Sequence, residues 1–351
     1  MSTQEYFLGT ASPIGFRTKF GEQINKPGYY TYILKGGPGT GKSTLMKKAA
    51  EHFKNSPLSV YRCSSDTNSL DAVIIEDKKI IIVDGTSPHV FDPIYPGVSQ
   101  EIVNLGSFWN KSEIYKNRKA IKQLSDENQK YHQTTRRYIE AISALNSDIF
   151  RHAENCLDKL KLYAYIERLS KKLMRKSAVS GEGKREFCQL SAFTAEKYRT
   201  LPVKGSYSGY YIRDDYFAGG DCFLRKLADI FTDNGYDIII SECNMLGSPT
   251  FEHLVCRQLG LVFTTGNFLN RLTPDSENII NFTRFYNREA LSEKKQRISF
   301  NKKAVTELAD EAAICLKTAL NIHDELEKYY VNAIDFKALN KMTSKFIESL
   351  E

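Results

Sequence analysis

An internal repeat is the feature of this sequence that most restricts what the chain can fold into. The stretch YYTYILKGGPGTGKSTLMKKAA, from Tyr29, has the same outline as YYIRDDYFAGGDCFLRKLA, from Tyr210. Further matches follow in the same order at a nearly constant offset, which indicates two copies of one structural unit. The matched residues include Gly41 with Gly220, Lys42 with Asp221, Ser43 with Cys222, Cys63 with Cys243, and Asp84 with Phe263.

The first copy contains a phosphate-binding motif. GGPGTGKST fits the pattern G-x-x-x-x-G-K-[ST], with an apolar run before it and a helical pattern after it. Glycines leave room for backbone N–H groups to wrap a phosphate, and a helix that starts near Lys42 directs its positive end at the same anion. We expect Lys42 to reach the phosphates of ATP or another NTP, and Ser43 to ligate Mg²⁺. The predicted nucleotide-binding residues are Gly36, Gly37, Pro38, Gly39, Thr40, Gly41, Lys42, Ser43 and Thr44.

A second motif follows in KKIIIVDGT. An apolar strand that ends in Asp84 is what a Walker B site requires, and this carboxylate would hold Mg²⁺ through water beside Ser43. Gly85 stands where fast AAA-like ATPases usually have a glutamate that orients the attacking water. Hydrolysis is therefore slow, or another residue does this work, or the phosphoryl group passes to a substrate.

Three residues are candidates for that missing role. We name His89 as the catalytic candidate alongside Lys42 and Asp84, and Thr86 and Asp66 as further possibilities. A role in shaping the loop explains His89 equally well. An Asx turn or a helix cap is the ordinary explanation for Asp66.

The second copy lacks this chemistry. The lysine, the hydroxyl and the Walker B aspartate are all replaced, and Asp214 and Asp215 would repel a triphosphate. We expect a degenerate site whose unit packs against the first as the second lobe of a pseudo-dimer. Arg213 or Arg225 could act as an arginine finger, although a surface salt bridge is the simpler role for either.

Strands alternate with helices in both halves, and each half ends in a long helical stretch. This order predicts an α/β fold of two tandem P-loop NTPase-like parallel-sheet units, each followed by a coiled-coil-like helical hairpin. We expect domains at 1–176 and 187–351, joined by the small polar linker 177–186. The helical arms would occupy 111–176 and 292–351.

Apolar residues at alternating three- and four-residue steps define the arms, for example from Ile121 to Ile149 and from Val305 to Tyr329. Breaks near Asn146 to Asp148 and near Asn332 to Asp335 would let each arm turn back. The sequence leaves open whether an arm packs on its own domain or on another protomer of a homo-oligomer.

Charge and cysteine content limit the class of protein. The net charge of +7 is concentrated in residues 111–176, so the first arm is either a solvated helical face or a docking surface for an acidic protein or a nucleic acid. Seven cysteines without close pairs indicate reduced thiols in a cytoplasmic protein. No apolar run is long enough for a membrane span, and no signal peptide is evident.

The segments YILKGGPGTGKSTLMKK, CSSDTNSLD, DGTSPH and DPIYPG together resemble a poorly characterised family of bacterial tandem P-loop ATPase-like proteins found mostly in Firmicutes. The resemblance covers essentially the full chain and is strongest from Tyr6 to Asn110. Members of that family often keep a second P-loop, from which this chain departs at Asp214 to Cys222. The resemblance implies an ATP-binding, ATP-hydrolysing cytoplasmic protein and supplies no substrate.

Three functions compete on this basis. The first is a slow Mg²⁺-dependent ATPase with one working site, whose nucleotide state moves the helical arms. The second is a P-loop kinase for an unknown small molecule or nucleotide, favoured by the missing glutamate. The third is an adaptor that binds nucleic acid or protein under the control of ATP, favoured by the basic first arm.

Overall fold

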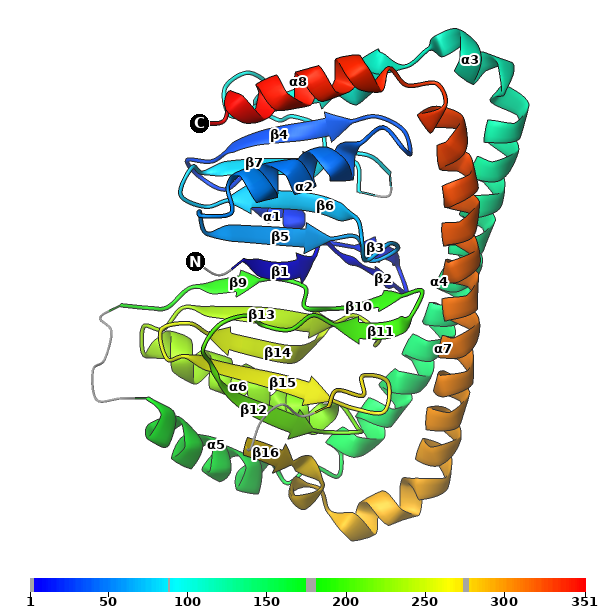
Figure 1. Ribbon diagram of the computed structural model, residues 1–351. Helices are drawn as coiled ribbons and strands as arrows, with labels where there is room; N and C mark the ends of the chain where they lie inside the picture. The colour runs from blue at the N-terminus through cyan, green and yellow to red at the C-terminus, as the bar shows by residue number, and fades with distance from the viewer. Residues whose placement is uncertain (1–2, 88, 175–180, 274–277) are drawn as a thin grey trace.

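The computed structural model describes residues 3–87, 89–174, 181–273 and 278–351. Two α/β units lie one above the other, and two long helices, α4 and α7, run along one side of both (Figure 1). The predicted α/β fold of two repeated units with long helical arms is confirmed.

The first unit is built on a six-stranded sheet in the order β1-β5-β6-β7-β4-β8. Five strands are parallel, and β6 runs antiparallel to both of its neighbours. No strand was predicted at β6, and its all-buried LDAVII makes the sheet mixed instead of purely parallel. The elements are β1 (Gln4–Phe7), the β2–β3 hairpin (Thr10–Ser12, Gly15–Arg17), α1 (Phe20–Ile24), β4 (Tyr30–Lys35), α2 (Lys42–His52), β5 (Leu58–Arg62), β6 (Leu70–Ile75), β7 (Ile80–Asp84), β8 (Gln100–Asn104) and the 3₁₀ turn η1 (Leu105–Phe108).

The second unit repeats this topology strand for strand. Its sheet has the order β9-β13-β14-β15-β12-β16, again with one antiparallel strand, β14. A register shift interrupts the pairing at Tyr61/Arg62 in one unit and at Ser241/Glu242 in the other. The elements are β9 (Arg185–Phe187), the β10–β11 hairpin (Ser191–Thr194, Lys197–Thr200), β12 (Ser208–Arg213), α6 (Ala218–Asp233), β13 (Ile238–Cys243), β14 (Thr250–Cys256), β15 (Leu261–Gly266), β16 (Asn278–Asn281) and η2 (Phe282–Phe285).

Strand pairing corrects one match of the repeat. Leu34 and Ile212 are equivalent, and they lie opposite Asp84 and Thr265 respectively. The counterpart of Asp84 is therefore Thr265 and not Phe263. A slip of two residues leaves every side chain on the same face of a strand, so the apolar pattern alone could not detect it.

The arms consist of α3 (Lys111–Lys116), α4 (Arg118–Glu154) and α5 (Lys159–Leu173) in the first half, and of α7 (Arg288–Val331) and α8 (Phe336–Glu348) in the second. The break predicted near Asn332 to Asp335 is confirmed. The break predicted at Asn146 to Asp148 is wrong, because α4 continues through these residues. The Asn146 amide donates to the Met245 carbonyl (2.9 Å), and Arg297 of α7 pairs with Asp148 (2.7 Å), so tertiary contacts hold polar residues within the helix.

The two long helices pack on each other in antiparallel directions. Asn128 of α4 donates to the Ala319 carbonyl, while Asn301 of α7 donates to Asp148 near the other end of α4. The short helix that follows each long helix lies on the opposite unit: α5 of the first half covers the second unit, and α8 of the second half covers the first unit (Figure 1). The C-terminal helix of each arm therefore packs on the other unit of the same chain.

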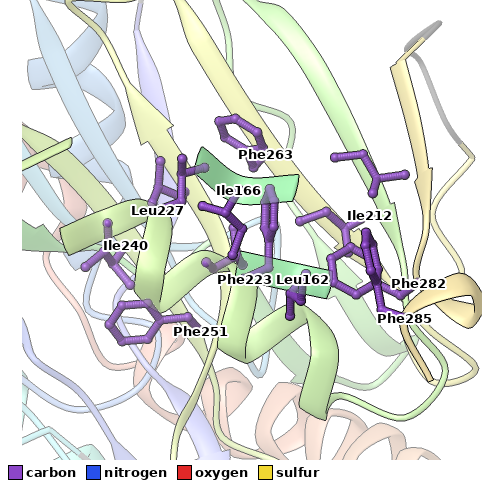
Figure 2. Close-up of a cluster of buried hydrophobic side chains, with 14 of the residues drawn as sticks. Leu162, Ile166, Ile212, Phe223, Leu227, Ile240, Phe251, Phe263, Phe282 and Phe285 are labelled. Carbon is purple, nitrogen blue, oxygen red and sulfur yellow. The ribbon is translucent and has the colours of Figure 1, made fainter. Parts of the chain in front are cut away.

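Buried apolar side chains fix this arrangement. Figure 2 shows Leu162 and Ile166 of α5 among phenylalanines of the second unit, including Phe223 and Phe285. In the equivalent contact on the first unit, Leu339 and Ile347 of α8 lie in the core of that unit. They belong to the same cluster of buried side chains as Leu34, Leu45, Met46 and Ala49.

The loop between the last two helices of each arm is hydrogen bonded to the residue that precedes the first helix of the other arm. The Asn110 amide donates to Ala333 O (2.7 Å), and the Asn287 amide donates to Cys156 O in the equivalent position (2.8 Å). The matching geometry gives the molecule an approximate internal twofold symmetry.

The edge strand β1 joins the two units directly, since Phe7 N donates to the carbonyl of Gln189, which lies just after β9 (2.7 Å). The predicted linker 177–186 lies partly outside the described residues, and β9 begins within it at Arg185. The seven cysteines are free thiols. Among the helices that the structure describes, none combines the length and apolar character needed to cross a bilayer.

Candidate functional site

The loop between β4 and α2 has the backbone geometry of an anion-binding turn. Gly39 and Gly41 have φ angles of 66° and 82°, in the left-handed region where a side chain would be strained. The Thr40 hydroxyl donates to Gly37 O (2.8 Å) and closes the loop on itself. The α2 helix follows directly, so its unpaired N-terminal amides face the same space.

Lys42 lies over this loop from the first turn of α2. Its Nζ donates to the carbonyls of Gly36 (3.1 Å) and Gly37 (2.9 Å), and it lies 3.6 Å from Asp84 Oδ2. Both side chains are largely buried. The structure therefore brings the predicted lysine and the predicted Walker B aspartate together.

The remaining loop residues differ in their surroundings. Ser43 Oγ accepts a hydrogen bond from the amide of Leu70 (3.0 Å), which links the loop to the start of β6. Thr44 is exposed on the outer side of α2, and Pro38 is half-buried at the tip of the loop. A hydroxyl and a carboxylate at the end of a phosphate-binding loop are oxygen donors of the kind that suits Mg²⁺.

The segment after β7 is rigidly held. The Asp84 carboxylate accepts hydrogen bonds from the Thr86 amide (2.9 Å) and hydroxyl (2.6 Å), so Thr86 orients Asp84. A Cβ atom at Gly85 would lie 2.3 Å from Ile33 Cγ2. No side chain fits there, which explains why a glutamate is absent from this position. Lys35 Nζ donates to Gly85 O and Phe91 O and fixes both ends of the turn.

His89 lies in this turn and is only 7% exposed. Neither ring nitrogen has a hydrogen-bond partner among the residues that the structure describes. Burial lowers the pKa of the imidazole, while the nearby Asp84 carboxylate opposes that shift. The ring is therefore neutral at physiological pH, and it lies close to the residues that the P-loop brings together.

Asp71 of β6 is a site residue that the sequence analysis missed. Its side chain is buried beside Asp84, and desolvation together with the Asp84 charge raises its pKa to about 7. The available signal was a carboxylate one residue into an apolar run, just after the CSSDTNS segment. That segment contains Asp66, whose carboxylate accepts from Asn68 N (3.0 Å) and the Ser69 hydroxyl, so it forms an Asx turn.

The end of α7 covers the phosphate-binding loop, although it belongs to the other half of the chain. Glu327 Oε1 accepts a hydrogen bond from the Gly39 amide (3.0 Å). A Cβ built at Gly39 would lie 2.9 Å from Val331 Cγ2, and one at Gly41 would lie 3.3 Å from Leu339 Cδ2. The loop glycines are needed for this close approach, and no local sequence signal indicates it.

Aromatic rings cover the same loop from one side. A Cβ at Gly37 would touch Trp109 and Tyr330, at 3.3 and 3.1 Å, and the centres of these two rings are 5.5 Å apart. Trp109 Nε1 is buried and has no hydrogen-bond partner. The ring contacts therefore connect the loop to the arm of the second half.

In the second unit an internal carboxylate takes the place of a bound anion. Asp214 is 1% exposed and accepts hydrogen bonds from the amides of Gly220 (2.8 Å) and Tyr216 (3.1 Å) and from the Tyr286 hydroxyl. Burial raises its pKa, and these hydrogen bonds oppose the rise. Its oxygens thus satisfy an amide at the start of α6.

The two candidates for an arginine finger, Arg213 and Arg225, both lie in the second unit. Arg225 pairs with Asp221 one helical turn away (2.8 Å) and also donates to Pro249 O, so its guanidinium is held within the second unit. Arg213 ends β12 with an exposed side chain.

Comparison with known proteins bears on the first unit. Residues 31–86 match the family model described as AAA domain (dynein-related subfamily). No curated protein and no solved structure matches the chain. The matched segment runs from β4 to Thr86 and includes Lys42, Ser43 and Asp84, so it supports an ATPase-type nucleotide site here. Over residues 31–86, the chain is similar to AAA-type P-loop ATPases.

Proposed function

We propose that this protein is a slow Mg²⁺-dependent ATPase with one working site, in the N-terminal half, whose nucleotide state controls the packing of the α7 arm. The observation that carries the proposal is the hydrogen bond from the Gly39 amide to Glu327. A carboxylate from the opposite half of the chain occupies an amide that a nucleotide phosphate would use.

The residues of the first loop suit a nucleoside triphosphate. Gly36 to Gly41 would wrap the phosphates, and Lys42 would exchange its two carbonyl partners for phosphate oxygens. Ser43 and Asp84 would hold Mg²⁺, which supplies charge neutralisation on the β- and γ-phosphates. Thr86 would keep Asp84 oriented for this task.

The second half supports the proposal through its chemistry. Asp214 is a buried acid just before α6, and Asp221 is a largely buried acid in the first turn of that helix. The connection from β12 to α6 is also shorter than the one from β4 to α2. Because Asp214 already caps the helix, a phosphate would have to displace a buried carboxylate. We infer a structural role for this unit, in which it anchors α7.

Phosphate binding would act on the arm by competition. A triphosphate in the loop would place negative charge beside Glu327, in a partly buried space where repulsion is poorly screened. Glu327 would then leave Gly39, and α7 would lose a contact at the end nearest to α8. The long α4–α7 pair would carry this change to the second unit.

Slow turnover follows from the lack of space at Gly85. The kinase alternative predicts the same nucleotide site but a different product. An acceptor would be needed to release ADP, and no free phosphate would form in its absence.

The adaptor alternative depends on the first arm, where Lys119, Lys122 and Lys130 are exposed on α4. A salt-titrated DNA and RNA binding assay tests that alternative, and no binding at low salt would reject its nucleic-acid version.

The proposed function is tested by ATP binding and phosphate release in the wild type, in Lys42→Ala and in Lys47→Ala, a control on the exposed side of the same helix. Loss of the charge-assisted contacts of Lys42 should weaken binding by roughly 10–100-fold and abolish turnover. Lys47→Ala should match the wild type. ATP affinity that survives Lys42→Ala would reject the proposed site.

A further inference from the structure

Three potential ligands of a cation meet beside the P-loop. Asp71 comes from β6, Asp84 ends β7 and His89 lies in the turn that follows. One ligand atom from each lies within 4.8 Å of the other two. We infer that Asp71, Asp84 and His89 form a direct binding site for one divalent transition-metal ion, such as Mn²⁺, Co²⁺ or Zn²⁺. The inference deepens the proposed function, on which it rests for the role of the ion but not for its binding.

The surroundings of His89 point to a missing partner. Both ring nitrogens are buried and form no hydrogen bond with any residue that the structure describes, although an unsatisfied polar atom in a protein interior is unfavourable. Phe16 and Phe91 flank the ring, with centres 5.5 and 6.1 Å away, so they offer no polar atom. The backbone amide of His89 donates to Thr86 O (3.1 Å), which holds the residue beside Asp84. A metal ion would satisfy one of these nitrogens.

Charge balance favours the same conclusion. Two carboxylates lie together in a buried space, and Lys42 forms a salt bridge with Asp84. Asp71 forms no salt bridge with any residue that the structure describes. One divalent cation would balance both carboxylates and free Lys42 for phosphate.

The donor set selects the class of metal. Mg²⁺ and Ca²⁺ prefer oxygen ligands alone, whereas Mn²⁺, Co²⁺ and Zn²⁺ accept imidazole with carboxylates. Ligand bonds of roughly 2.1 Å place ligand atoms at most about 4.2 Å apart, so the three side chains need only a small inward adjustment. The proposed ion shares Asp84 with the nucleotide-bound Mg²⁺ but uses neither Ser43 nor the phosphates.

The test is a titration of the nucleotide-free full-length protein with Co²⁺, followed by visible absorption. The wild type should bind one Co²⁺ at this site with a ligand-field band. Asp71→Asn and His89→Gln, which preserve side-chain size, should each weaken that binding at least about tenfold. Circular dichroism checks that each variant is folded. If His89→Gln does not fold, the Co²⁺ affinity of Asp71→Asn alone tests the site.

Two controls separate this site from others. Lys47→Ala should leave the Co²⁺ band unchanged, because Lys47 lies on the exposed side of α2. A second group of potential ligands, His323, Asp324 and Glu327, lies on the more exposed surface of α7. His323→Gln removes its imidazole and should also leave the band unchanged.

The outcomes are distinct. An unchanged affinity in Asp71→Asn, or a band lost only in His323→Gln, would overturn the inferred site. A Co²⁺ band that needs Asp71 in a protein that shows no ATP binding would support the metal site while rejecting the proposed function. Normal ATP binding with no Co²⁺ band would reject the metal site alone.

Discussion

The Glu327 carboxylate of α7 accepts a hydrogen bond from the Gly39 amide of the P-loop, with 3.0 Å between the two atoms. These residues belong to different halves of the chain, and the contact exists because each arm crosses to the opposite unit. The Gly39 amide is thereby occupied by a carboxylate of the same chain.

Replacing Glu327 with glutamine should tighten ATP binding by roughly 5–30-fold, or about 1–2 kcal/mol, because the competing negative charge is removed. Isothermal titration calorimetry with Mg²⁺-ATP measures the change. Glu325→Gln is the matched control, since Glu325 lies on the same part of α7 and pairs with Lys328 at the surface. Equal affinities in both variants would show that Glu327 does not compete with phosphate.

Trp109 should report nucleotide binding by its fluorescence, because it is the only tryptophan of the chain and lies against Gly37 and Tyr330. If ATP displaces the end of α7, the indole becomes more exposed and its emission shifts to longer wavelength. The shift should saturate with ATP and be absent in Lys42→Ala. A shift of similar size in Lys42→Ala would mean that the signal does not come from the P-loop.

Leu162→Ala should destabilise the protein by about 2–5 kcal/mol, because the wild-type side chain is fully buried in the core of the second unit (Figure 2). Leu160→Ala, at a position of the same helix that is 84% exposed, should change stability by less than about 0.5 kcal/mol. Urea unfolding measures both. Similar values for the two variants would contradict the packing of α5 on the second unit.

Glu252 should make the protein less stable as pH rises. Burial raises the pKa of this carboxyl from its ordinary 4.5 to about 7, although Tyr198 and Asn270 donate hydrogen bonds to it. The neighbouring His253 is no cation, since burial lowers its pKa to about 3. Below pH 4.5 the carboxyl is protonated in the folded and the unfolded states, and it has no effect on stability.

Between pH 4.5 and 7 the unfolded chain loses the proton while the folded chain keeps it. The free energy of unfolding should therefore fall by about 3 kcal/mol over this range and then level off. Urea unfolding at pH 5 and pH 8 should show this loss reduced in Glu252→Gln and unchanged in Glu196→Gln, whose side chain is exposed. The same loss in all three proteins would assign the pH dependence to other groups.

Local patterns accounted for much of the first unit. The strand, the glycine-rich turn and the helix with Lys42 follow from short-range spacing, and the structure has them at those positions. The same holds for β7 and its terminal Asp84. The strand β6 was missed because six buried residues after a polar loop carry no alternating pattern.

The sequence by itself determined that the chain contains two related α/β units and that only the first has the G-x-x-x-x-G-K-[ST] pattern, because repeats, glycines and a lysine are local properties. Tertiary structure alone decided that the arms cross, that Glu327 meets Gly39 and that Asp71 meets Asp84 and His89. These contacts join residues far apart in the chain or on separate strands. They depend on which apolar faces bury each other, and many alternative pairings would satisfy the same helical periodicity.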